Sequence, residues 1–145
     1  MRSTTHQWLL LWIARKMAAD GFLIRGYDGP TPQGGEWNSL PRVFQVGGVR
    51  PDAWGMRPET HQIAIGEAKT VEDLESQHTQ KQMRVFGRLL ERGSSRLCRL
   101  YLATPRSGVY ALDRCLARAE LLGATHIVRL HIPDCLVEQG AGEYV

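Results

Sequence analysis

The fold of this chain is decided by residues 49–69, which read VRPDAWGMRPETHQIAIGEAK. Two extended runs, 49–55 and 62–69, flank a segment with proline and polar turn residues, as in a β-hairpin. Residues two apart on a strand share a face, so Glu67 and Lys69 project to the same side of the second run. An otherwise apolar strand should not carry two charges on one face unless something there needs them.

The spacing of the hairpin brings a second carboxylate to this pair. Asp52 follows Pro51, and fourteen residues lie between it and the Glu67-Ala68-Lys69 segment. If the turn is centred between residues 59 and 60, antiparallel pairing puts Asp52 directly opposite Glu67, with Cβ atoms about 4.5–5.5 Å apart. A register shifted by one residue would turn Asp52 to the other face. Two carboxylates this close repel each other unless a divalent cation lies between them, so the hairpin predicts an oxygen-rich metal site beside an ammonium group.

The rest of the chain predicts an α/β fold. Helices are expected at residues 4–20, 72–92 and 109–122, and strands at 22–27, 49–55, 62–69, 97–104 and 126–132. The last two strands alternate with helices, so we expect them to join the hairpin in parallel. The sequence therefore predicts one domain over residues 1–145, with a mixed central sheet flanked by helices on both faces. Residues 28–41 are expected to form a loop, and residues 133–145 a flexible tail.

The composition is that of a soluble globular protein, with 145 residues, 43% hydrophobic and 23% charged. The three cysteines lack C-x-x-C spacing, so we expect the reduced thiols of a cytoplasmic protein rather than a zinc site or disulfides. The apolar run at 8–14 is too short to span a membrane, and the segment before it does not read as a signal peptide. A net charge of +3 permits a polyanionic partner without requiring one.

The motif residues and the element order together resemble the PD-(D/E)XK nuclease superfamily, whose restriction-endonuclease-like core runs helix, three strands, helix, strand. The resemblance implies that Asp52 and Glu67 hold Mg²⁺, for which Mn²⁺ can substitute, and that the main-chain carbonyl of Ala68 is a further ligand. It also implies that Lys69 orients the attacking water or stabilises the pentacovalent state. An electrostatic role for Lys69 is favoured over that of a general base.

The helix after the hairpin adds a fourth candidate. On a helical wheel Gln82 lies in the middle of the apolar face, flanked by His78, and a buried amide needs polar partners. Gln82-x-x-x-Phe86 is similar to the Gln-x-x-x-Tyr motif of RecB-type members, with Phe in place of Tyr. The phrase GEAKT at 66–70, followed by this helix, looks like the small stand-alone nucleases of the VRR-NUC kind. The resemblance covers roughly residues 4–104 and implies that Gln82 positions the lysine, the water or the phosphate.

The first helix departs from the family pattern. Many members carry a glutamate there as a further metal ligand, whereas this chain offers His6 and Gln7 and no acid before Asp20. Water, Gln7 or His6, or a loop acid such as Asp28 or Glu36, would complete the ligand set. Of these, Gln7 is preferred, because a neutral oxygen can bind Mg²⁺ or its water.

Basic residues recur along the 72–92 helix. Arg84, Arg88 and Arg92 are spaced every four residues, and Lys81 precedes them. Such a stripe can track the phosphates of a nucleic acid. A solvated helix face is the other interpretation.

The leading hypothesis is therefore a Mg²⁺-dependent deoxyribonuclease that acts endonucleolytically and selects DNA by structure. RNA stays open as a substrate, and a homodimer or a larger nuclease complex as the assembly. The structural alternative is an ion-paired surface triad of Asp52, Glu67 and Lys69. The functional alternative is a non-catalytic nucleic-acid-binding or assembly module that keeps the fold, which the unusual first helix and Phe86 motivate.

Overall fold

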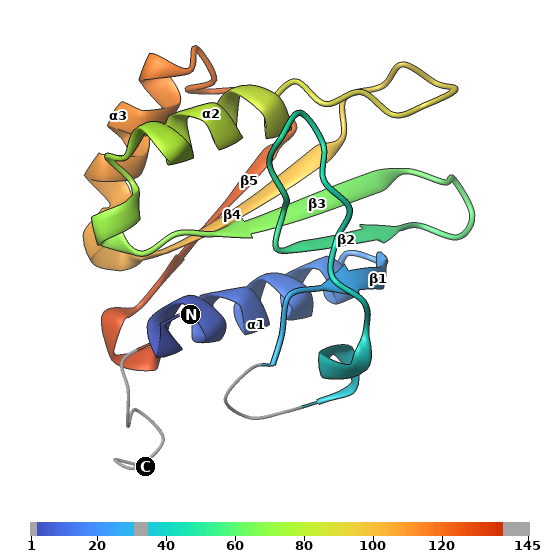
Figure 1. Cartoon of the computed structure of the whole chain (residues 1–145), viewed down its shortest axis with the longest axis horizontal. Helices are drawn as coiled ribbons and strands as arrows, with labels where there is room; N and C mark the ends of the chain where they lie inside the picture. Colours follow the sequence, from blue (N-terminus) through green and yellow to red (C-terminus); the bar gives the residue numbers. More distant parts are fainter. Residues whose placement is uncertain (1–2, 31–34, 138–145) are drawn as a thin grey trace.

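In the computed structural model, which describes residues 3–30 and 35–137, five strands form one sheet in the order β1-β2-β3-β4-β5 (Figure 1). The strands are β1 (Leu23–Tyr27), β2 (Ala53–Met56), β3 (Ile63–Ala68), β4 (Arg99–Pro105) and β5 (Ile127–Ile132). The first three pair antiparallel, and β4 and β5 join β3 in parallel. The mixed sheet expected from the sequence is confirmed.

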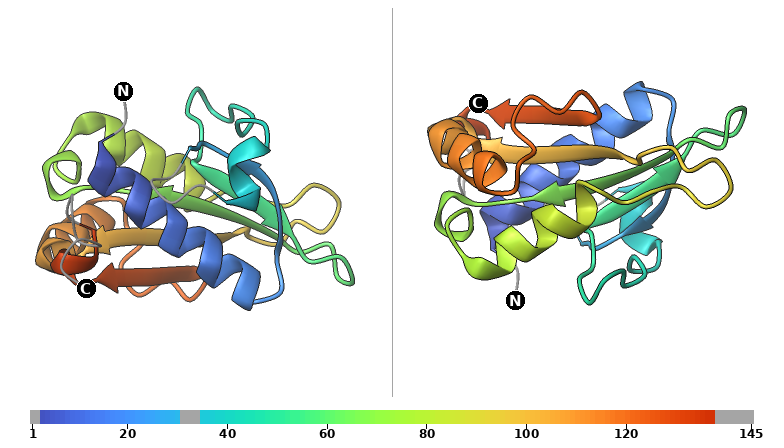
Figure 2. Two further views of the ribbon diagram at one scale, coloured as in Figure 1. Left: turned by 90° about the horizontal axis from the view of Figure 1, so that it is seen from below. Right: turned by 90° about the horizontal axis from the view of Figure 1, so that it is seen from above.

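Helices cover both faces of this sheet. The helices are α1 (Thr4–Ala19), α2 (Gln77–Phe86) and α3 (Val109–Arg118). Figure 1 shows α1 on one side of the strands and α2 and α3 on the other, and the two views of Figure 2 agree. One apolar core lies between α1 and the sheet, and a second lies between the sheet and the α2–α3 pair. The expected order of elements and the two-sided cover are both confirmed.

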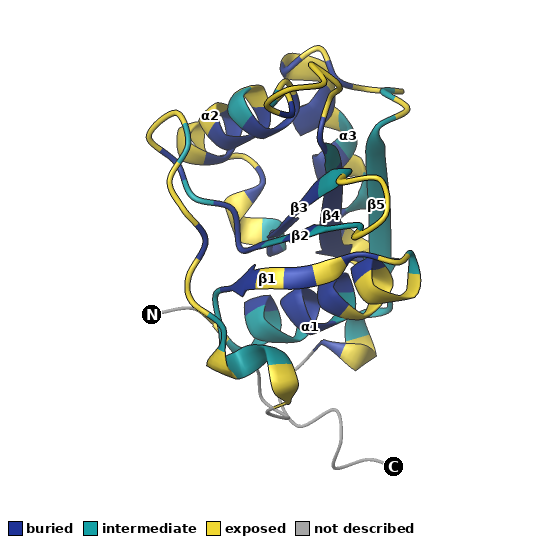
Figure 3. Ribbon diagram, turned by 90° about the vertical axis from the view of Figure 1, so that its right-hand side faces the viewer, coloured by how far each residue is buried: buried dark blue, intermediate teal, exposed yellow. Residues whose placement is uncertain are grey.

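Strand β3 is buried because both of its faces are covered, as Figure 3 shows for the central strands. Ala64 and Ala68 belong to the α1 core, and Ile65 belongs to the other core. Gly66 lets α1 approach closely, since a Cβ there would lie 2.6 Å from Cγ2 of Ile13. From Ala64 onward the strand offers no solvent-facing position, and this is why Glu67 is withdrawn from water as well.

The prediction of one long helix over residues 72–92 is wrong. A short 3-10 helix, η2 (Val71–Asp73), comes first, and α2 begins only after Ser76 and ends at Phe86. Ser76 has extended backbone angles, and its hydroxyl oxygen accepts the N–H of Thr79 at 3.1 Å. Because this capping geometry requires a non-helical residue, the helix restarts there.

The ends of the chain and the long loop contain further short elements. Within residues 28–41, η1 (Glu36–Ser39) is helical, and residues 31–34 lie outside the described part. After β4 comes η3 (Arg106–Gly108), and after β5 comes η4 (Asp134–Leu136). Of the tail expected from residue 133 onward, Val137 is buried at 1% exposure, and residues 138–145 lie outside the described residues.

No helix within the described residues combines the length and the apolar character that a bilayer crossing requires.

Candidate active site

The hairpin register is as predicted along the whole of β2. Ala53 pairs with Gly66 and Met56 with Ile63, which is the register that places the turn between residues 59 and 60. The ladder becomes irregular at Asp52, whose N–H donates to the carbonyl of Gly66 at 2.9 Å. Asp52 and Ala53 therefore both face Gly66, as two residues do in a β-bulge, and a bulge re-aims the side chain that it carries.

The carboxylate of Asp52 is fixed by two contacts on the same oxygen. Oδ2 accepts the N–H of Ala68 at 2.9 Å and lies 3.0 Å from Nε2 of His6. Both side chains are buried, with Asp52 at 0% and His6 at 3% exposure. His6 reaches this position because it lies in the first turn of α1, where the hydroxyl of Ser3 accepts its backbone N–H at 3.1 Å.

The second carboxylate belongs to a buried trio from β3 and α2. Oε2 of Glu67 lies 3.1 Å from Nζ of Lys69 and accepts Nε2–H of Gln82 at 3.0 Å. The ammonium of Lys69 also donates to Oε1 of Gln82. One amide therefore fixes the carboxylate with its nitrogen and the ammonium with its oxygen. The exposed fractions are 0% for Glu67, 6% for Lys69 and 4% for Gln82.

One peptide group connects the two halves of the cluster. Glu67 and Ala68 are adjacent, so the Ala68 N–H that binds Asp52 lies next to the Glu67 carboxylate along the chain. Burying an ionised group costs roughly several kcal/mol unless the group is paired and hydrogen-bonded. The four predicted residues Asp52, Glu67, Lys69 and Gln82 are thus assembled in the interior, and the surface-triad alternative is wrong.

Two expectations about neighbouring residues need correction. His6 contacts Asp52, whereas Gln7, the preferred first-helix candidate, is half-buried and lies about 100° further round α1. His78 is exposed rather than on the buried face beside Gln82. The wheel misplaced it because it defined the apolar face partly by Leu74 and Leu89, which both lie outside α2 (Gln77–Phe86).

The donor set suits a hard cation held by few protein ligands. Within the described ranges 3–30 and 35–137, no group of three or more His, Cys, Asp or Glu side chains is arranged to hold a metal ion. Mg²⁺, however, is commonly bound through one or two carboxylates and keeps several waters. Asp52 and Glu67 meet that requirement by chemistry, and the Ala68 carbonyl at the end of β3 remains a predicted third oxygen.

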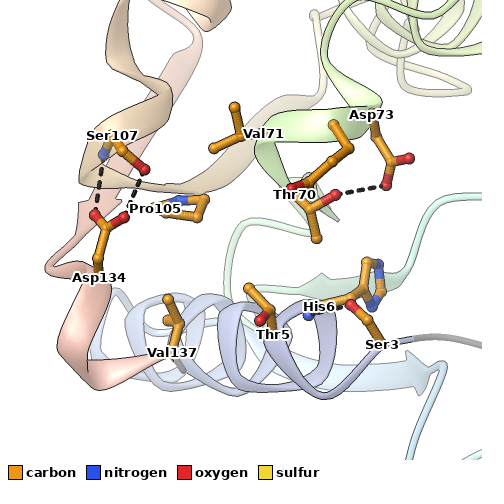
Figure 4. A pocket seen from close by; sticks show the side chains of 11 residues that line it. Ser3, Thr5, His6, Thr70, Val71, Asp73, Pro105, Ser107, Asp134 and Val137 are labelled. Carbon is orange, nitrogen blue, oxygen red and sulfur yellow. Dashed lines mark hydrogen bonds between the residues drawn. The ribbon is translucent and has the colours of Figure 1, made fainter. Parts of the chain in front are cut away.

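Two hollows open beside the cluster, and Asp73 lines both of them. The larger, about 670 Å³, lies between the start of α1, the η2 segment and the η3 and η4 segments (Figure 4). Its polar lining includes His6, Thr70 and Asp134. Hydrogen bonds from the hydroxyl and the N–H of Ser107 hold the pKa of the Asp134 carboxyl below its usual range, so it is negative at neutral pH.

The smaller hollow, about 330 Å³, opens onto Lys69 and Gln82. Its other walls come from residues 45–50 before the hairpin and from the first turn of α2. Arg50 contributes to this wall, and no pattern in the sequence had singled it out.

The predicted basic residues divide between two places. Lys81 lies beside the smaller hollow, with Nζ 3.1 Å from the position that a Cβ of Gly48 would occupy. Arg84 and Arg88 instead line a separate surface depression together with Arg118 of α3. Arg88 and Arg92 both lie beyond the end of α2, so the predicted stripe of three arginines on one helix is not formed.

Comparison of the chain with protein-family models, with curated proteins and with solved structures found no match, so its function must be inferred from the site itself.

Proposed function

We propose that this protein is a Mg²⁺-dependent nuclease with a restriction-endonuclease-like core of the PD-(D/E)XK type. The single observation that carries the proposal is the buried cluster of Asp52, Glu67, Lys69 and Gln82, which comes from the β2–β3 hairpin, including the residues just before β2 and just after β3, and from α2. The order of the elements, α1 followed by three strands, α2 and β4, agrees with that core. The β2–β3 hairpin supplies the motif residues, as in the superfamily.

Stability alone is a poor reason for such a cluster. Replacing a buried ion pair by packed apolar residues is often neutral or stabilising, by about 1–4 kcal/mol. Glu67 and Lys69 nevertheless share the interior with a second carboxylate, Asp52, and with a hydrogen-bonded amide. A hydrolytic site explains why the charges are present, because phosphodiester cleavage needs both anionic metal ligands and a cation.

The residues would divide the chemistry as follows. Asp52 and Glu67 would hold Mg²⁺, or Mn²⁺ in its place, with the Ala68 carbonyl as a further ligand. Divalent cations at such sites stabilise the charge that develops on phosphoryl oxygens and make water a better nucleophile. Lys69 would orient the attacking water or stabilise the pentacovalent phosphorus by its charge. Gln82 holds Lys69 and Glu67 in one fixed relation, so it is a positioning residue.

DNA is the substrate that we propose, with endonucleolytic and structure-selective cleavage. The motif resemblance supports phosphodiester chemistry, and the basic residues Lys81, Arg84 and Arg88 supply positive charge outside the cluster. A homodimer or a larger complex is compatible with this activity.

Cleavage of supercoiled plasmid and of a set of branched and flapped DNAs tests the proposal. The wild type should cut with Mg²⁺ or Mn²⁺ and not with a chelator, and Glu67→Gln and Asp52→Asn should each abolish cutting. Glu59→Gln, which alters an exposed carboxylate in the turn of the same hairpin, is the matched control and should cut normally. Cutting that persists in the two site variants would refute the assignment of the site.

A second candidate is a nucleic-acid-binding module that has the fold and no activity. It is favoured by the way protein groups occupy the carboxylates: His6 and Ala68 share one oxygen of Asp52, and Lys69 and Gln82 share one oxygen of Glu67. This candidate predicts DNA binding that is unaffected by Asp52→Ala and no cutting under any metal condition.

A further inference from the structure

Arg50 occupies an unusual position beside the cluster. It immediately precedes the Pro51-Asp52 segment and lines the same small hollow as Lys69 and Gln82. Its Nε is shielded from solvent and donates no hydrogen bond to any acceptor in the described residues. A buried donor without an acceptor costs free energy, so each such donor in a folded protein calls for an explanation.

The two hollows beside the cluster differ in charge. The larger one carries Glu72, Asp73 and Asp134 in its wall, with His6 as its basic residue. The smaller one carries Arg50 in its wall together with Lys69, which is already paired with Glu67, and with Asp73 and His78, and Lys81 lies next to it. An anionic ligand is therefore favoured in the smaller hollow and repelled from the larger one.

We propose that the smaller hollow binds a backbone phosphate of the nucleic acid next to the one that is cut, and that Arg50 is its principal contact. This inference rests on the proposed function. A guanidinium matches a phosphate because its planar N–H groups can donate to two phosphate oxygens at once. A small turn of the side chain toward an oxygen in the hollow also supplies the acceptor that Nε lacks. The nucleic-acid strand thus enters on the α2 side of the cluster, and the negative charge of the larger hollow excludes it from the α1 side.

Equilibrium binding of a short labelled DNA duplex in the presence of a chelator tests this without requiring cleavage. Arg50→Gln should weaken binding about tenfold and should reduce the slope of log K against log salt concentration by about 0.9, the loss of one phosphate contact. Arg50→Lys should restore most of the slope but less of the affinity, because an ammonium is a point charge. The matched control is Arg25→Gln, an exposed arginine on the edge strand β1.

A neutral methylphosphonate moved along the duplex, one linkage at a time, locates the contact. At one linkage the methylphosphonate should weaken DNA binding by the wild type but should cause no additional loss of DNA binding by Arg50→Gln. The inference is overturned if Arg50→Gln keeps the wild-type affinity and salt slope, or if no linkage shows this loss of additivity. Absence of DNA binding by the wild type would overturn it as well. DNA that is bound but never cut with any metal would instead overturn the proposed nuclease activity and leave the phosphate contact supported.

Discussion

The ion pair between Glu67 and Lys69 gives the sharpest prediction, since its two charges are almost completely removed from water. The side chains are 0% and 8% exposed, and the N–O separation is 3.1 Å. With an effective dielectric constant of about 20, Coulomb attraction at this distance is about 5 kcal/mol. Removing one partner leaves the other buried and uncompensated, so Glu67→Gln and Lys69→Met should each lower the free energy of unfolding by about 3–5 kcal/mol.

The double variant Glu67→Gln/Lys69→Met should recover most of that loss. It buries no uncompensated charge at these two positions, and the new amide can still hydrogen-bond with Gln82. We expect its free energy of unfolding to lie within about 1 kcal/mol of the wild type, or above it. All three variants should be inactive as nucleases, so the double variant separates loss of chemistry from loss of fold.

Urea unfolding followed by circular dichroism, with a chelator present, measures the effect. For an m-value of about 2 kcal/mol/M, the single variants should unfold at a urea concentration lower by roughly 1.5–2.5 M. Glu59→Gln, in the exposed turn, should keep the wild-type midpoint. If the single variants keep the wild-type midpoint, or if the double variant loses the sum of the two single losses, the two side chains are not energetically coupled and the reasoning is refuted.

Three further predictions concern the framework of the site. Burial would raise the pKa of Glu91, but hydrogen bonds from Ile63 N–H, Arg96 and Ser94 outweigh it and hold that pKa below the ordinary 4.5. The ionised carboxylate therefore adds stability that is present above pH ~4.5 and is lost as the pH falls through the lower pKa of the folded protein. The difference in free energy of unfolding between the wild type and Glu91→Gln should therefore narrow from pH ~6 to ~3. A difference that stays constant over this range would contradict the prediction. Gly66→Ala should cost about 1–3 kcal/mol because its Cβ would lie 2.6 Å from Cγ2 of Ile13, and Ile13→Ala, which removes that methyl group, should make the double variant lose less than the sum of the two single losses; strictly additive losses would show that the clash is absent. Ser76→Ala should cost about 1 kcal/mol in thermal unfolding and Ser76→Asp much less, because Ser76 caps α2; equal losses would argue against the cap.

The hairpin and its metal-ligand candidates could be predicted because their information is local. A turn fixes the register of the two strands that it joins, and a spacing of two fixes which side chains share a face. Glu67 and Lys69 accordingly lie together, and Ala53 pairs with Gly66 in the expected register. The irregular ladder at Asp52 was beyond this argument, because a bulge depends on contacts outside the hairpin.

The contact between His6 and Asp52 could not be predicted in the same way. The two residues are 46 positions apart in the sequence. No periodicity within α1 indicates whether His6 or Gln7 will point toward Asp52. The break before α2 had a local signal, because Ser76 is a preferred N-cap residue. Apolar residues continue at helical spacing on both sides of Ser76, but this pattern is weak evidence for a single helix. The N-cap residue is stronger evidence that the helix starts anew there.

The cluster unites α1, the β2–β3 hairpin and α2, and this arrangement has a consequence for the order of folding. Bringing distant segments together costs loop-closure entropy before their contacts form, so such contacts are made after local ones. The hairpin can pair early and itself supplies Ala68 and Lys69 as partners, but His6 reaches Asp52 and Gln82 reaches Glu67 only when α1 and α2 have docked on opposite faces of the sheet. A nascent or partly unfolded chain therefore carries the motif residues without the assembled cluster, and the proposed activity would begin only when folding is complete.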